Sequence, residues 1–205
     1  MKITDDHIGT TNKKLSASHE TRFDVLRKML TDQGKDVSAI LKKLETFQVA
    51  IPSWALGAGG TRFGRFGFKG EPSRLEEKID DVGILHKLTQ MAGAISLHIP
   101  WDVPEDYNAI KELAQSHDIV FDAMNSNTFQ DQIDAKSSYR FGSLSNVSKV
   151  SRDQAIAHNI DVINMGTKLG SKSLTVWLAD GSSLPGQANF QQALQNTEDS
   201  LKNIK

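Results

Sequence analysis

The sequence predicts a parallel α/β fold of the (β/α)8 TIM-barrel type, here the first four βα units preceded by N-terminal helices. Two observations predict it. After about residue 46, a short β-rich apolar run, a polar glycine-containing loop and an amphipathic helical stretch follow one another four times. The loops that leave the four runs hold aromatic, amide, imidazole and glycine residues, whereas the reverse connections hold almost none. We therefore expect residues 1–46 to form an N-terminal helical segment and residues 47–205 to form half of a barrel.

The N-terminal segment carries apolar residues at helical spacing, followed by Gly34 as a stop signal. The apolar positions between residues 12 and 33 are Leu15, Phe23, Leu26, Met29 and Leu30. A second, shorter helix is expected near residues 37–46.

Four strands are predicted, at residues 47–51, 94–99, 119–121 and 174–178. Helices are expected near 75–91, 105–117 and 150–169, and from about 190 onward. Strands that alternate with helices pair in parallel, so the loops at their carboxyl ends share one face. Four units make either a small open sheet or half of an eight-unit barrel, and the convergence of the polar and aromatic loops favours the half-barrel.

Composition excludes several classes of protein. The 205 residues include 24 basic and 25 acidic side chains, so no strong net charge attracts nucleic acid or anionic lipid. The chain has no cysteine, which excludes disulfides, thiol catalysis and thiolate metal sites. Because no apolar run has the length of a signal peptide or a membrane span, we expect a cytoplasmic protein without membrane contacts.

The first loop, residues 52–66, is rich in glycine but does not fit a nucleotide-binding motif. The third glycine of a dinucleotide fingerprint would fall on Arg62, and no Gly-Lys-Ser/Thr sequence closes a phosphate loop. Trp54 and Phe63 offer flat apolar faces that could pack on the C–H surface of a sugar. Alternatively, the glycines only permit an irregular backbone path.

The second strand ends in the sequence SLHIPWD, where alternation places His98 on the opposite face from Leu97 and Ile99. His98 would then point into the barrel mouth, as a proton-transfer group or as a structural histidine. Asp102 could orient His98 or cap the next turn. These two residues alone are too few to bind a metal.

The third and fourth loops add amide and aromatic candidates. Asn125 and Asn127 could bond sugar hydroxyls with both donor and acceptor atoms, or simply stabilise a turn. Trp177 and Asp180 are expected at the same rim, although Trp177 could instead belong to the core.

Four segments, WALGAGGTRFGRF, SLHIPWD, FDAMNSNTFQD and LTVWLADGSSLPGQANF, closely resemble the bacterial L-rhamnose isomerase family over about residues 47–205. The resemblance implies a (β/α)8 barrel with a xylose-isomerase-like architecture. It also implies a homotetramer that interconverts L-rhamnose, or related aldoses, with the ketose by means of divalent ions, typically Mn²⁺.

The same resemblance implies roles for individual residues. His98 would lie beside the sugar ring oxygen and assist ring opening, and Phe63 would reach a neighbouring subunit's substrate. The expected substrate-binding residues are Trp54, Phe63, Trp101, Asn125, Asn127, Phe129, Trp177 and Asp180.

The family's metal ligands would lie beyond residue 205, so none is expected in this chain, and the isolated chain is expected to be inactive. A complementary C-terminal half or a second copy would complete the barrel. The competing hypothesis is a non-catalytic sugar-binding or assembly half-barrel.

Overall fold

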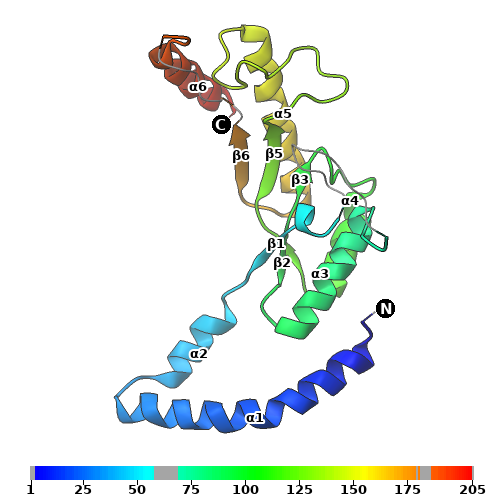
Figure 1. Ribbon diagram of the computed structural model, residues 1–205, viewed down its shortest axis with the longest axis vertical. Coiled ribbons are helices and arrows are strands. Elements are labelled where there is room, and N and C mark those ends of the chain that lie inside the picture. Colours follow the sequence, from blue (N-terminus) through cyan, green and yellow to red (C-terminus); the bar gives the residue numbers. More distant parts are fainter. Residues whose placement is uncertain (1–2, 58–68, 179, 181–185, 205) are drawn as a thin grey trace.

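The computed structural model describes residues 3–57, 69–178, 180 and 186–204 (Figure 1). Its helices are α1 (Asp5–Asp32), α2 (Val37–Glu45), the short 3-10 helix η1 (Ser53–Ala55), α3 (Leu75–Thr89), α4 (Tyr107–Ser116), α5 (Lys149–Leu169) and α6 (Phe190–Ile204). Its strands are β1 (Ala50–Pro52), β2 (Ala94–Ser96), β3 (His98–Ile99), β4 (Val120–Phe121), β5 (Met124–Thr128) and β6 (Leu174–Leu178).

All strand pairs among the described residues are parallel, in the orders β1-β2-β4 and β3-β5-β6. Only Leu97 separates β2 from β3, and its carbonyl accepts a hydrogen bond from the Asn125 N–H (2.8 Å). The strands therefore follow one another across space in the order of the chain. The predicted parallel α/β fold is confirmed, and closure into a barrel stays a prediction.

The sequence did not reveal β5, because its residues MNSNT include two asparagines, which are rare in strands. All five of its residues are buried, and β5 pairs with β3 on one side and β6 on the other. Pairing on both edges therefore outweighs the weak strand propensity of the segment. As a result, Asn125 and Asn127 lie on a strand rather than in a loop.

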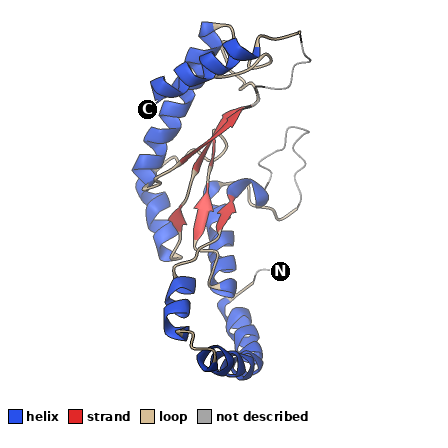
Figure 2. Cartoon of the chain, turned by 90° about the vertical axis from the view of Figure 1, so that its left-hand side faces the viewer, coloured by secondary structure: helices blue, strands red, loops and turns tan. Residues whose placement is uncertain are grey.

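The main core lies between the strands and the helices that cover one side of them (Figure 2). Ile79 and Val82 of α3 are fully buried together with Ile95 of β2. Helix α5 approaches β5 closely at Gly166, where an added Cβ would lie 2.6 Å from Met124 Cγ. A glycine at this position therefore sets the distance between α5 and the strand.

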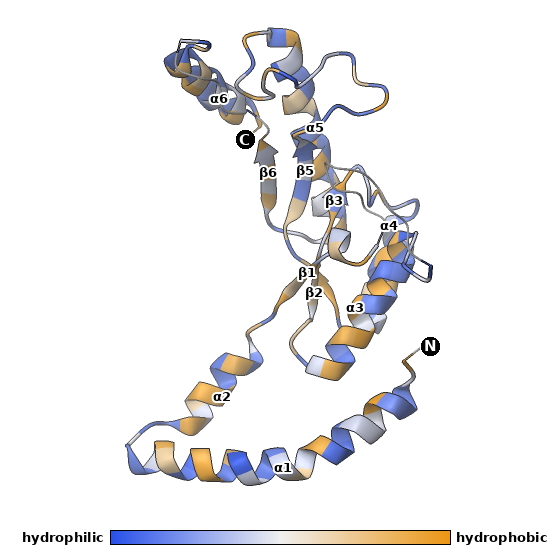
Figure 3. Ribbon diagram, viewed as in Figure 1, coloured by the Kyte–Doolittle hydropathy of each residue, from blue (hydrophilic) through white to orange (hydrophobic). Residues whose placement is uncertain are grey.

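Helices α1 and α2 extend away from the strands, and they carry apolar bands on their surfaces (Figure 3). Leu15, Leu26 and Met29 of α1 and Leu44 of α2 are exposed. Their positions agree with the two helices expected at the N-terminus. Among the described helices, none combines the length and apolar character that crossing a bilayer requires.

Truncation of Ile95 to alanine is expected to lower the free energy of unfolding by roughly 2–5 kcal/mol, because a fully buried side chain would be replaced by a cavity. Urea unfolding followed by circular dichroism measures this change. The control is Ile133→Ala at a fully exposed isoleucine, which should alter stability by less than about 0.5 kcal/mol. Equal effects of the two substitutions would contradict the packing described here.

Candidate functional site

Five ring side chains meet where the strands end, with His98 at their centre. The ring centroids lie 4.1 Å (Trp101), 5.5 Å (Trp54) and 5.7 Å (Phe129) from that of His98. Trp177 completes the group, at 6.4 Å from Trp54 and 6.2 Å from Phe129. We call Trp54, Trp101, Phe129 and Trp177, together with His98, the aromatic cradle.

The parallel sheet explains why these residues meet. Trp54 lies on η1 directly after β1, and Trp101 lies in the turn after β3. Phe129 follows the last residue of β5, and Trp177 is the fourth residue of β6. Carboxyl ends of parallel strands share an edge, so four segments that are distant in sequence deliver their rings to one place. The cradle also contains all three tryptophans of the chain.

His98 is a buried imidazole, only 3% exposed, and its Nε2 atom has no hydrogen-bond partner among the described residues. Burial is the main cause that lowers the pKa of His98 from 6.5 to about 4, and the nearby Asp102 opposes this effect. His158 and Lys78 lower the pKa further. His98 is therefore uncharged at neutral pH, and its buried Nε2 keeps its hydrogen-bonding capacity within the described part of the chain.

Asp102 holds the backbone near His98. Its carboxylate accepts a hydrogen bond from the His98 backbone N–H (2.8 Å), from the Ser53 hydroxyl and from Lys78 Nζ (2.6 Å). Of the two roles left open by the sequence, this geometry supports the capping of the turn.

The two asparagines on β5 differ in their bonding. Asn125 accepts a hydrogen bond from Trp177 Nε1 (3.0 Å) and donates to the carbonyls of Leu97 (3.0 Å) and Ala123 (3.1 Å). Asn127 is fully buried, and neither its Oδ1 nor its Nδ2 has a partner in the part of the chain that the structure describes. Asn127 is in register with Trp177, so both belong to the same face of the sheet. Asn125 thus positions an indole, whereas Asn127 keeps its bonding capacity.

The remaining predicted residues lie elsewhere or outside the described part. Asp180 accepts hydrogen bonds from the backbone N–H groups of Ser143 (2.8 Å) and Ser145 (2.7 Å), and from the Ser143 hydroxyl. It therefore fixes the loop that precedes α5. Phe63 lies outside the described residues.

Sequence reasoning missed Ser53, Lys78 and His158. His158 of α5 accepts a hydrogen bond from the Asn127 backbone N–H (3.0 Å), and burial lowers its pKa. Lys78 is a buried lysine within the apolar stripe of α3, three residues after Leu75. A lysine among the apolar residues of a helix indicates a buried ion pair, because lysine is almost never fully buried unless it is paired. Nothing in the local sequence marked Ser53 or His158.

The described residues contain no group of three His, Asp or Glu side chains that could hold a metal ion. The carboxylate of Asp102 is engaged by three donors, and that of Asp180 likewise by three. The described part of the chain therefore does not supply the donor set that Mn²⁺ requires.

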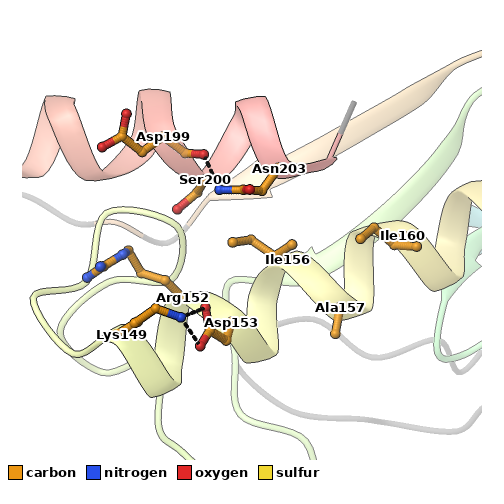
Figure 4. Close-up of a pocket in the computed structure, with 9 residues that line it drawn as sticks. All are labelled: Lys149, Arg152, Asp153, Ile156, Ala157, Ile160, Asp199, Ser200 and Asn203. Atoms are coloured by element: carbon orange, nitrogen blue, oxygen red, sulfur yellow. Dashed lines mark hydrogen bonds and ion pairs between the residues drawn. The ribbon is translucent and has the colours of Figure 1, made fainter.

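Described residues also line cavities outside the cradle, of which two are of similar size. One, of about 590 Å³, lies between α5 and α6, and the residues that line it include the charged Lys149 and Asp153 (Figure 4). The other, of about 680 Å³, is lined by Asn127, His158 and residues of the loop before α5.

The chain is similar to bacterial proteins named as probable sugar isomerases. A protein of Rhizobium meliloti with this name is 44% identical over 197 residues, which is 93% of this chain and 46% of that protein. A second, from Mesorhizobium japonicum, is 48% identical over 185 residues, which is 90% of this chain and 43% of that protein. The chain thus spans somewhat less than half the length of these relatives.

No family model matches the sequence. Among solved structures, D-psicose 3-epimerase from Clostridium cellulolyticum is 12% identical, with a TM-score of 0.48 over 76% of this chain and 46% of the epimerase.

We expect the imidazole of His98 to titrate near pH 4, which NMR of ¹⁵N-labelled protein would measure. The unfolded state binds this proton below pH 6.5, whereas the folded state binds it only near pH 4. The free energy of unfolding therefore has its full value above pH 6.5 and decreases as the pH is lowered from 6.5 to 4. One imidazole changes the free energy of unfolding by at most about 1.4 kcal/mol per pH unit. His98→Gln should reduce the slope, and His19→Gln, at an exposed site on α1, should not. A midpoint for His98 above its ordinary value would contradict the buried, uncharged imidazole.

Proposed function

We propose that this chain forms the sugar-binding wall of a sugar isomerase active site, and that its substrate is L-rhamnose, converted to L-rhamnulose. The observation that carries the proposal is the aromatic cradle around an uncharged His98 with an unpaired Nε2. The similarity to proteins named as probable sugar isomerases supports the class of reaction. The motif resemblance supports L-rhamnose as the aldose.

The cradle suits a pyranose because such a ring has apolar C–H faces and polar edges. Indole and phenyl rings pack on the C–H faces, while a few buried polar groups fix the orientation. We propose Asn127 as a partner for hydroxyl groups that reach the neighbouring cavity, which it lines with His158, because its amide has no partner among the described residues. Asn125 contributes indirectly, because it holds the Trp177 indole.

His98 can assist ring opening by moving a proton. Opening breaks the bond between C1 and the ring oxygen, removes a proton from the anomeric hydroxyl and places one on the ring oxygen. A neutral imidazole accepts a proton at its unprotonated nitrogen and donates one from the other, so it can serve either oxygen. The low pKa keeps His98 in this neutral form at physiological pH.

Manganese belongs to this proposal for the assembled enzyme. The described residues of this chain offer no donor set for it. We propose that a polypeptide equivalent to the remaining part of the relatives, or a further copy in a homotetramer, completes the site.

A second candidate function is a non-catalytic sugar-binding or assembly module. The carboxylates of the described residues favour it, because those nearest the cradle are engaged in structural bonds. Sugar binding without turnover in the completed assembly would select this function.

Addition of L-rhamnose is expected to change the tryptophan fluorescence of the chain, because all three tryptophans lie in the cradle. Phe129→Ala should weaken the affinity roughly five- to tenfold through the loss of one aromatic wall. The matched control is Phe141→Ala, at an exposed phenylalanine outside the cradle, which should leave the affinity unchanged. Equal affinities of the two variants would remove the cradle as the binding site.

Mixing this chain with the part of the Mesorhizobium japonicum relative that lies outside the match should give Mn²⁺-dependent conversion of L-rhamnose to ketose. In that assembly, His98→Asn should slow turnover by roughly 100-fold or more, whereas His19→Asn should not. A folded, metal-loaded assembly that forms no ketose would contradict the proposed reaction. Turnover by this chain alone, abolished by EDTA, would contradict the need for a second polypeptide.

A further inference from the structure

One buried ion pair lies directly beneath the cradle. Lys78 Nζ is 2.6 Å from Asp102 Oδ1, and both side chains are almost completely buried. The other oxygen of the carboxylate accepts hydrogen bonds from the Ser53 hydroxyl and from the His98 backbone N–H (2.8 Å). The Asp102 N–H donates to the His98 carbonyl (3.0 Å). Each oxygen of this carboxylate therefore has at least one partner.

The donors belong to the segments that carry the cradle. Ser53 precedes Trp54, Asp102 follows Trp101, and His98 is itself the central ring. The Asp102 carboxylate consequently connects η1, β3 and the turn after β3. Its ion pair with Lys78 connects the same carboxylate to α3. This single carboxylate therefore contacts the segments that carry three of the cradle rings.

Stability alone does not explain the pair. Apolar residues of similar volume in place of a buried ion pair often leave stability unchanged or higher, whereas removal of one partner is strongly destabilising. A buried Lys–Asp pair therefore needs a further reason to be present. Precise placement of its neighbours is such a reason, because charge-assisted hydrogen bonds are short and directional.

The pair also affects the charge of the imidazole. The groups that face His98 are Asp102, which raises its pKa, and Lys78 and His158, which lower it. Burial is the largest cause that keeps His98 neutral, and Lys78 acts in the same direction, against the carboxylate of Asp102. Without the lysine, the anion would favour the charged imidazole.

We propose that Lys78 and Asp102 are positioning residues that hold Trp54, His98 and Trp101 in the arrangement that binds the sugar. Part of this inference rests on the proposed function, since a sugar is the ligand. The arrangement of the rings can be measured without any sugar.

The test compares two charge-free double variants. Lys78→Met with Asp102→Asn removes the buried pair and leaves no unpaired charge. Lys149→Met with Asp153→Asn removes an exposed pair of the same residue types on α5, also at 2.6 Å. Three properties are measured for each folded variant: near-UV circular dichroism with tryptophan emission, the pH titration of His98, and L-rhamnose affinity.

We expect the buried double variant to keep its far-UV spectrum, to change its tryptophan signals, and to bind L-rhamnose roughly tenfold more weakly. The exposed double variant should match the unmodified chain in all three. Lys78→Met alone should raise the His98 midpoint, because one of the charges that lower its pKa is removed. Ser53→Ala keeps both charges and removes one donor, so it should shift the tryptophan signals in the same direction by less, and it provides the test if the double variant does not fold.

A folded buried double variant, or a folded Ser53→Ala variant, with unchanged tryptophan signals and unchanged affinity would overturn the inference. If the unmodified chain does not bind L-rhamnose, the proposed function fails. The positioning role of Lys78 and Asp102 is then still tested by the tryptophan signals and the His98 titration.

Discussion

Parallel pairing in chain order is the constraint on which the rest of this structure depends. It requires each strand to be followed by a crossover, which places the helices on one side, and it brings the carboxyl ends of β1, β3, β5 and β6 to one edge. The rings of the cradle meet there because each lies near the carboxyl end of a strand or shortly after it. A single shift of register would turn Trp177 and Asn127 to the opposite face of the sheet.

The sequence predicts this arrangement where local patterns decide it. The loops after the predicted strands and the alternation along residues 94–99 predicted one converging site with Trp54, His98 and Trp177. The family resemblance added Trp101 and Phe129, and the five rings do lie together. Their role in binding a substrate stays a proposal. The strand β5 was not predictable in the same way, since pairing on both edges, a property of the folded chain, determines it.

The roles of the polar side chains could be predicted from the sequence only in part. Asn125 and Asp180 have the right chemistry for a sugar ligand, yet in the fold one holds an indole and the other holds a loop. Asp102 and Lys78 lie 24 residues apart and meet only through packing of α3 against the strands. Residue type thus indicates which groups can bind a ligand, while tertiary hydrogen bonds determine which of them are already occupied.

Trp177, which forms one side of the cradle, lies on an edge strand. Among the described strands, β6 pairs with β5 alone, and Trp177 on it is 45% exposed. A strand from another polypeptide that paired with β6 would fix the backbone beneath this tryptophan and shield its indole from water. Assembly at that edge and ligand binding in the cradle would then share a side chain, so the affinity for a ligand would depend on protein concentration. Such a thermodynamic link between binding and assembly would run through Trp177.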